Sequence, residues 1–263
     1  MSRRGLMRGG LAGLGGAAAG IAVLRGREWI GPDRLPLDGG YAPAGNELGG
    51  QGRGAVSVLW HVRTEQPLVA LTFDDGPAPD WTPRVLDTLD RLDVAATFFV
   101  VGQRLRRHAA LVRDRYARHE VGNHTWAHKD LAQRDERGVR DQLRRCHDAV
   151  ADVLGREPTL LRPPWGHLGG TTLTVAEELG YDVVMWSRQM REAAFARDPA
   201  GIVADTVAAA RPGAIILAHD VGDRRRLVTI DHLTGIVAGL RDRGLRPVTV
   251  SALRAAAAAD PAP

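Results

Sequence analysis

The sequence predicts an α/β fold built on a parallel sheet, either open or closed into a barrel. From about Gln66 onward, short apolar runs alternate with amphipathic stretches, a pattern typical of strand and helix units joined by right-handed crossovers. Glycines follow several helical stretches, at Gly155, Gly180, Gly213 and Gly244, where a left-handed residue commonly ends a helix. Ionisable residues follow the apolar runs, and such sheets gather their catalytic groups at that end.

The expected strands are short, mostly apolar runs bounded by turn-forming or charged residues. In chain order they are Leu68–Phe73, Ala95–Val100, Glu120–Asn123, Thr159–Arg162, Asp182–Trp186, Ala214–Ala218 and Arg246–Val250. The expected helices have apolar residues at helical spacing. They are Thr82–Leu92, Arg104–Arg118, Arg134–Leu154, Thr171–Leu179, Pro199–Ala210 and Thr229–Arg243. We therefore expect a single domain at residues 66–255, followed by a C-terminal tail at 256–263.

Residues 1–30 have the pattern of an export signal. Arg3 and Arg4 precede a weakly apolar stretch rich in Gly and Ala, and this resembles a twin-arginine signal. The segment is either cleaved or retained as a membrane anchor; an unstructured basic tail is the alternative. Residues 31–65 are rich in Gly and Pro without a sustained period, as in a linker. We expect an exported protein, extracellular or associated with the cell envelope.

Composition narrows the class of protein. The only cysteine, Cys146, excludes an intrachain disulfide and a thiolate metal cluster, and we expect it in the core. The formal net charge of +4 comes partly from the N-terminal arginines, and no basic stripe interleaves with aromatic residues. We therefore expect no nucleic-acid partner. The charged run Asp223–Arg226 is either solvated or in contact with an anionic glycan.

Two segments carry the chemistry. Asp74 and Asp75 end the first expected strand, and His124 and His128 follow a later one. On one helical turn, the i, i+4 spacing would bring the two imidazoles together, and one aspartate would complete a three-ligand metal site with an open position. The second carboxylate stays free for proton transfer. The alternatives are an Asx-turn at the aspartates and an exposed histidine pair without a ligand.

Four motifs in order identify a family. Thr72–Pro77, His124–His128, Arg162–Gly166 and Leu217–Asp220 resemble the signature motifs of the polysaccharide deacetylases with a NodB-type domain. The resemblance covers about residues 66–253. It implies a distorted (β/α) barrel of about seven parallel strands, a divalent metal that is usually Zn²⁺, and hydrolysis of an acetyl group from an acetylated polysaccharide.

The resemblance also implies roles for individual residues. Asp75, His124 and His128 would bind the metal, Asp74 would be the general base and His219 the general acid. A bound divalent metal would activate water and polarise the acetyl carbonyl.

Four further positions complete the site that the resemblance implies. Arg162 would pair with Asp74 and keep it ionised, and the backbone N–H of Trp165 would stabilise the oxyanion. Trp186 and Leu217 would enclose the acetyl methyl group, although both positions also suit plain core packing. Trp165 stands where members of the family usually have Tyr.

A second departure from the family pattern follows the fifth strand. Glu192 stands where the family has an aspartate that orients the catalytic histidine, and Gln189 is the other candidate partner of His219. The longer Glu192 side chain would need a shifted backbone to reach His219. If it does orient His219, Glu192→Ala should lower kcat more than it raises KM.

Three functions compete at this stage. The first is an exported, metal-dependent deacetylase that removes N-acetyl or O-acetyl groups from peptidoglycan, chitin-like chains or another polysaccharide. The second is a hydrolase of a small cyclic amide or a formylated sugar on the same fold. The third is a glycan-binding module with weakened catalysis, suggested by the altered run around Glu192. The oligomeric state is open.

Overall fold

The computed structural model describes residues 56–259. The predicted export signal at 1–30, residues 31–55 of the predicted linker and the last four residues of the predicted tail lie outside the described residues. No helix within the described range is both long enough and apolar enough to cross a lipid bilayer.

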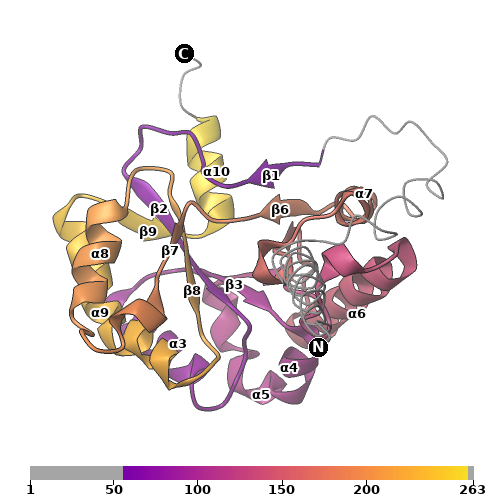
Figure 1. The fold of residues 1–263 in the computed structure, drawn as a ribbon, viewed down its shortest axis with the longest axis horizontal. Coiled ribbons are helices and arrows are strands. Elements are labelled where there is room, and N and C mark those ends of the chain that lie inside the picture. The colour runs from indigo at the N-terminus through magenta and orange to yellow at the C-terminus, as the bar shows by residue number, and fades with distance from the viewer. Residues whose placement is uncertain (1–55, 260–263) are drawn as a thin grey trace, which may run out of the picture.

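A curled parallel sheet forms the centre of the fold (Figure 1). Its strand order is β1-β6-β5-β4-β3-β2-β8-β7, and β9 pairs with β2 beside this path. All strand pairs are parallel, which confirms the predicted α/β class. The strands are β1 Val58–Leu59, β2 Leu68–Asp74, β3 Thr97–Val100, β4 Glu120–Asn123, β5 Leu160–Leu161, β6 Asp182–Val184, β7 Arg188–Gln189, β8 Ile215–His219 and β9 Arg246–Val248. Each predicted strand is present, and β1 and β7 are added.

One segment bends the sheet into an incomplete barrel. Residues 182–189 begin as β6, which pairs with β1 and β5 near one end of the strand order, and continue as β7, which pairs with β8 at the other end. Between the two strands, the N–H of Ser187 donates to the carbonyl of Ile215 at 3.1 Å, a normal hydrogen-bond distance. The same stretch of chain therefore connects both ends of the sheet and gives the distorted barrel.

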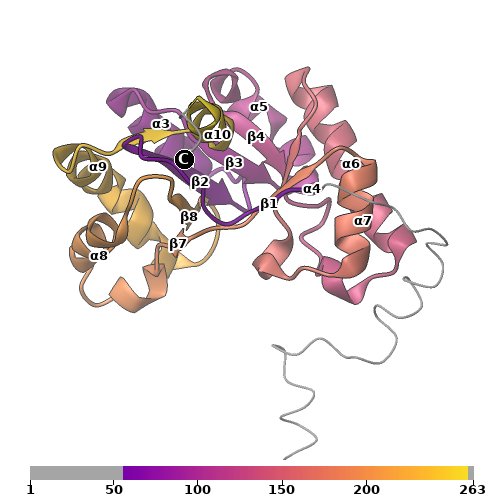
Figure 2. The ribbon, with the colours of Figure 1, turned by 90° about the horizontal axis from the view of Figure 1, so that it is seen from above.

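Helices surround the sheet and bury its central strands (Figure 1). Figures 1 and 2 show α8 and α9 together on one side and α6 and α7 on the opposite side. Every residue of β2 is buried, as expected for a parallel strand covered on both faces. The helices are α3 Thr82–Leu92, α4 Gly102–Arg107, α5 Ala109–Val112, α6 Glu136–Leu154, α7 Gly170–Glu178, α8 Gly201–Ala209, α9 Leu227–Asp242 and α10 Val250–Ala258.

Three local differences from the sequence analysis stand out. The helix expected at Arg104–Arg118 is divided into α4, α5 and a 3-10 turn at Arg115–Arg118, because His108 leaves the helical conformation with φ −118° and ψ 25°. Strand β1 lies within the expected linker. The expected strand at Arg246–Val250 ends at Val248, and α10 follows it into the expected tail. The folded unit thus extends past both expected boundaries.

Candidate active site

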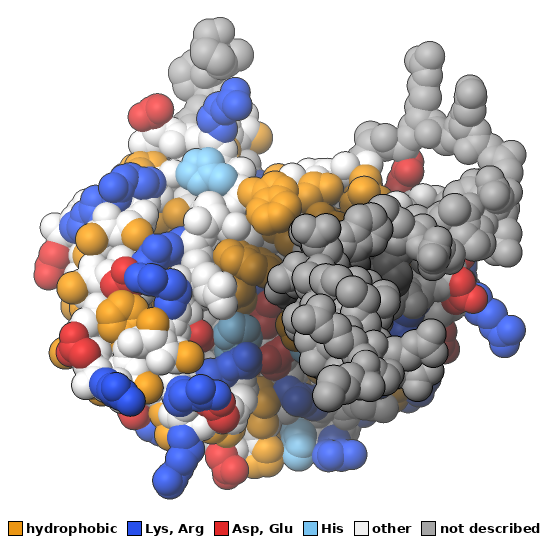
Figure 3. Space-filling view, viewed as in Figure 1, with side chains coloured by type: hydrophobic (Ala, Val, Ile, Leu, Met, Phe, Trp, Pro, Cys, Tyr) orange, Lys and Arg blue, Asp and Glu red, His pale blue; other side chains and the backbone are white. Residues whose placement is uncertain are grey.

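The side chains that the sequence analysis selected come together at the carboxyl ends of the strands. Asp74 ends β2 and pairs in register with His219 at the end of β8. His124 follows β4, and Arg162 follows β5. Figure 3 shows acidic, basic and histidine side chains gathered near the middle of one face. Parallel strands direct their carboxyl ends to one edge, so residues distant in sequence meet there.

Asp75, His124 and His128 form a candidate metal centre. One ligand atom from each lies within 4.8 Å of the other two. Oδ1 of Asp75 is 3.4 Å from Nε2 of His124 and 3.0 Å from Nε2 of His128. Nδ1 of His124 is 2.7 Å from the carbonyl oxygen of Arg162; because a carbonyl only accepts, we assign the proton to Nδ1, which leaves Nε2 as the ligand atom. This donor set fits a catalytic zinc site.

The groups of this centre shift one another's protonation. Burial alone would raise the pKa of Asp75, but the hydrogen bonds and charges of His124 and His128 outweigh it and hold the pKa well below its usual range. Burial alone would lower the pKa of His124, but the charge of Asp74 and the contact with Asp75 raise it. The carboxylates that raise the pKa of His124 would also attract a cation, and metal binding would displace the proton from its Nε2.

A loop, and not a helical turn, carries the two histidines. No residue from His124 to His128 is helical, and Thr125 and His128 have left-handed φ values of 69° and 51°. Asn123 holds the loop, because its Oδ1 accepts from the N–H of Thr125 at 2.8 Å and its Nδ2 donates to the carbonyl of Leu143 at 2.9 Å. The predicted helical turn is wrong, yet the imidazole centroids lie 5.1 Å apart.

Arg162 is fully buried beneath the site and fixes Asp74. Its Nη1 donates to Oδ1 of Asp74 and to Oγ1 of Thr72, both at 2.7 Å. Its Nε and Nη2 donate to two carbonyl oxygens at the end of β6, at 3.0 and 2.8 Å, and the guanidinium lies over the ring of Phe99. A buried guanidinium needs such partners, and each nitrogen of the Arg162 guanidinium has one.

His219 contacts Glu192, and not Gln189. Nδ1 of His219 is 3.0 Å from Oε1 of Glu192, and both side chains are largely buried. Gln189 is exposed in β7. The 3-10 turn that begins at Glu192 directs the Glu192 side chain, which is one methylene longer than the expected aspartate, toward the end of β8. The contact leaves Nε2 of His219 as the ring nitrogen available to a substrate.

The remaining predicted positions differ in exposure. Trp165 is 58% exposed with φ 56°, and its ring stands edge-on to His128 at a centroid distance of 4.5 Å. Trp186 is half-buried and Leu217 is buried within β8. Glycine is required at 166, where φ is 72° and a Cβ would lie 2.7 Å from the Trp186 ring.

Two residues of the site were not assigned a role from the sequence. Asp220 is completely buried, its Oδ2 accepts from the hydroxyl of Thr82 at 2.6 Å, and burial raises its pKa to about 7. Arg226 reaches back to Asp75, with Nη1 at 2.7 Å from Oδ2. Asp220 follows His219 in a motif that was already recognised, whereas Arg226 belongs to a charged run that favours a solvated interpretation.

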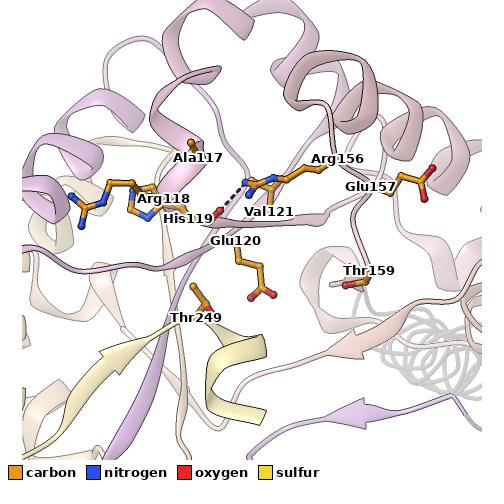
Figure 4. Close-up of a pocket in the computed structure, with 9 residues that line it drawn as sticks. All are labelled: Ala117, Arg118, His119, Glu120, Val121, Arg156, Glu157, Thr159 and Thr249. Carbon is orange, nitrogen blue, oxygen red and sulfur yellow. Dashed lines mark hydrogen bonds between the residues drawn. The ribbon is translucent and has the colours of Figure 1, made fainter. Parts of the chain in front are cut away.

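A separate pocket of about 330 Å³ lies at the other end of the strands (Figure 4). It adjoins the start of β4 at Glu120 and residues Thr159 and Thr249. Arg156 spans its edge and donates to the carbonyl of His119 at 2.7 Å. Basic and acidic side chains both line it, and the metal-ligand group lies elsewhere. We therefore assign the candidate active site to the carboxyl ends of the strands.

Several known proteins are similar in sequence to this chain. The family model for polysaccharide deacetylase matches residues 61–184. A peptidoglycan-N-acetylglucosamine deacetylase of Bacillus cereus is 35% identical over 74% of this chain and 92% of its own length. A peptidoglycan-N-acetylglucosamine deacetylase of Listeria monocytogenes is 38% identical over 70% of this chain, and the match spans 38% of that protein's length.

A solved structure agrees with the fold. The Bc1960 peptidoglycan N-acetylglucosamine deacetylase, in complex with a naphthalenyl N-hydroxybenzamide, superposes with a TM-score of 0.71 at 29% identity. The match covers 74% of this chain and 92% of that one. Together with the sequence matches, this shows that the chain belongs to the polysaccharide deacetylase family of hydrolases.

Proposed function

We propose that this protein is an exported, metal-dependent deacetylase that removes N-acetyl groups from a polysaccharide of the peptidoglycan or chitin type. The observation that carries the proposal is the convergence of a three-ligand group, a second carboxylate and a histidine at one edge of the sheet. The names of the relatives, which are peptidoglycan and chitooligosaccharide deacetylases, support the substrate class. The basic N-terminal segment supports export.

The metal would be held by Asp75, His124 and His128. We propose zinc, because one carboxylate and two imidazoles suit that ion. When bound there, zinc supplies Lewis acidity toward water and an acetyl carbonyl.

Asp74 is the proposed general base. Its Oδ1 is held by Arg162 at 2.7 Å, and its Oδ2 is 3.9 Å from Nε2 of His124, so Oδ2 faces the metal-ligand group. A carboxylate fixed in this way can accept the proton of an attacking water without reorienting. The pairing with the buried guanidinium fixes the orientation of the carboxylate and leaves Oδ2 available to accept a proton.

His219 is the proposed general acid. Oε1 of Glu192 accepts from Nδ1–H, which fixes the orientation of the ring and leaves Nε2 for the substrate. The protonated Nε2 can then donate to the departing amine of the sugar. The exposed ring of Trp165 beside His128 offers an apolar wall to the bound sugar, and we keep its backbone N–H as the proposed oxyanion donor.

The proposal is tested by acetate release from peptidoglycan, N-acetylchitooligosaccharides and acetylxylan. Each substrate is incubated with the zinc-loaded protein and with the chelator-treated protein. We expect zinc-dependent release from peptidoglycan or the chitooligosaccharides. Release only from acetylxylan would replace the amide substrate with an ester. Zinc binding without release from any of the three would favour the small-amide hydrolase or the glycan-binding module.

A further inference from the structure

Asp75 is held from both sides of its carboxylate. Oδ1 faces the two histidines, at 3.4 Å from Nε2 of His124 and 3.0 Å from Nε2 of His128. Oδ2 faces away from them and accepts a hydrogen bond from Nη1 of Arg226 at 2.7 Å. The backbone carbonyl of Asp75 also accepts from Nη1 of Arg104 at 2.7 Å. The two carboxylate oxygens thus have different partners, and only Oδ1 lies with the other ligand atoms.

Local backbone contacts and a glycine fix the position of the Arg226 side chain. This residue ends the 3-10 turn Arg224–Arg226, whose first residue follows Asp223; Oδ1 of Asp223 accepts from the N–H of Arg225 at 2.8 Å. Nη1 of Arg226 also donates to the carbonyl of Val221 at 2.7 Å. Gly222 leaves room for the side chain, because a Cβ at 222 would lie 2.3 Å from Cδ of Arg226. These contacts with the turn therefore fix the position of the guanidinium.

We propose that Arg226 is a positioning residue for the metal ligand Asp75, and that it raises the affinity of the site for zinc. By occupying Oδ2, the guanidinium fixes the carboxylate rotation that presents Oδ1 to the ion together with both imidazoles. The inference rests on the proposed function, since it takes Asp75 as a ligand. Partners that hold a metal ligand in this way commonly change metal affinity or activity by about 10- to 100-fold.

The charge of Arg226 acts against this effect, because a cation near the site repels zinc. The Arg226 side chain is 32% exposed, so water and salt screen much of that repulsion. The side chain of Asp75 is only 13% exposed, so its protein contacts, and not water, set the orientation of its carboxylate. We therefore expect the orienting effect to exceed the repulsion. The two effects have opposite signs, so the direction of the change in zinc affinity decides between them.

The test is a zinc titration of the protein comprising residues 1–263 in competition with a chromophoric chelator. Arg226→Met removes the guanidinium and keeps the aliphatic stem. We expect it to raise the Kd for zinc about tenfold or more. Arg226→Lys retains one charged donor and should fall between the wild type and Arg226→Met. Arg224→Met, in the exposed part of the same turn, removes the same charge without touching Asp75 and should match the wild type.

Thermal unfolding of the metal-free variants separates a local effect from loss of the fold. If Arg226→Met does not fold, the affinity of Arg226→Lys carries the test. A Kd for Arg226→Met within about twofold of the wild-type value, or a tighter one, would overturn the proposal. Acetate release by the wild type is measured in parallel, so that a wild type that binds zinc without releasing acetate contradicts the proposed function and leaves this inference standing.

Discussion

Replacing Glu192 with glutamine should slow the reaction without weakening substrate binding. Glu192→Gln keeps the shape of the side chain and removes the charge that faces Nδ1 of His219 at 3.0 Å. The two side chains are 6% and 13% exposed, so water does not replace the lost partner. The wild-type pair therefore has a charge-assisted hydrogen bond that a neutral amide does not reproduce.

The magnitude follows from the geometry. A hydrogen bond to a charged group contributes roughly 1.5–3 kcal/mol, and each 1.36 kcal/mol corresponds to tenfold in rate. We expect kcat to fall about 10- to 100-fold in Glu192→Gln, and further in Glu192→Ala, with KM changed by less than about twofold. The assay is acetate release from an N-acetylchitooligosaccharide over a range of concentrations at saturating zinc.

A matched control is Glu157→Gln, which makes the same chemical change at an exposed position beside the separate pocket. It should retain wild-type kinetics. A folded Glu192→Gln variant with wild-type kcat would refute the role of Glu192. A rise in KM with unchanged kcat would also contradict it, because that result would assign Glu192 to substrate binding.

Three further predictions concern the site and its support. Chelation with EDTA should abolish acetate release and added zinc should restore it, since Asp75 lies in a three-ligand group; full activity after chelation would exclude this metal site. Gly76→Ala would place a Cβ 2.2 Å from Oδ2 of Asp220, so it should destabilise the fold by roughly 1–3 kcal/mol in urea unfolding. Gly170→Ala, whose Cβ meets no atom within 4 Å, is the control, and equal stabilities would contradict the packing at Gly76. Asp220→Asn tests the raised pKa of about 7. Because the pKa of Asp220 is raised in the folded state, the wild-type protein loses stability as the pH rises from about 4, the pKa of an aspartate in the unfolded chain, toward 7. The free energy of unfolding of metal-free Asp220→Asn, relative to that of the wild type, should therefore increase by up to roughly 3 kcal/mol between about pH 5 and pH 8. A difference that stays constant with pH would refute this.

The fold was largely predictable because its central strands, such as β2 and β3, are buried along their whole length. Continuous apolar runs such as Leu68–Phe73 correspond to β2 almost residue for residue. Strands β1 and β7 contain only two residues each, too few to produce a periodic signal. Helix α10 was missed because its first residue, Val250, was included in the expected strand Arg246–Val250 and its last residues were included in the expected tail.

The site was predictable in its members and less so in its local geometry. His124 and His128 lie together, but left-handed residues in a loop bring them there, and i, i+4 spacing does not distinguish a loop from a helix. The contact of Glu192 with His219 depends on where a 3-10 turn begins. Arg226 pairs with Asp75 from 151 residues away, and a charged run viewed alone indicates only a solvated surface.

The central claim is that Asp74 acts as the base beside a metal held by its neighbour Asp75. The measurement that tests it most directly compares wild type and Asp74→Asn in zinc affinity and in acetate release from N-acetylchitooligosaccharide or peptidoglycan. We expect Asp74→Asn still to bind one zinc per chain and to release acetate at least about 100-fold more slowly. A zinc-loaded Asp74→Asn variant with wild-type acetate release would contradict it.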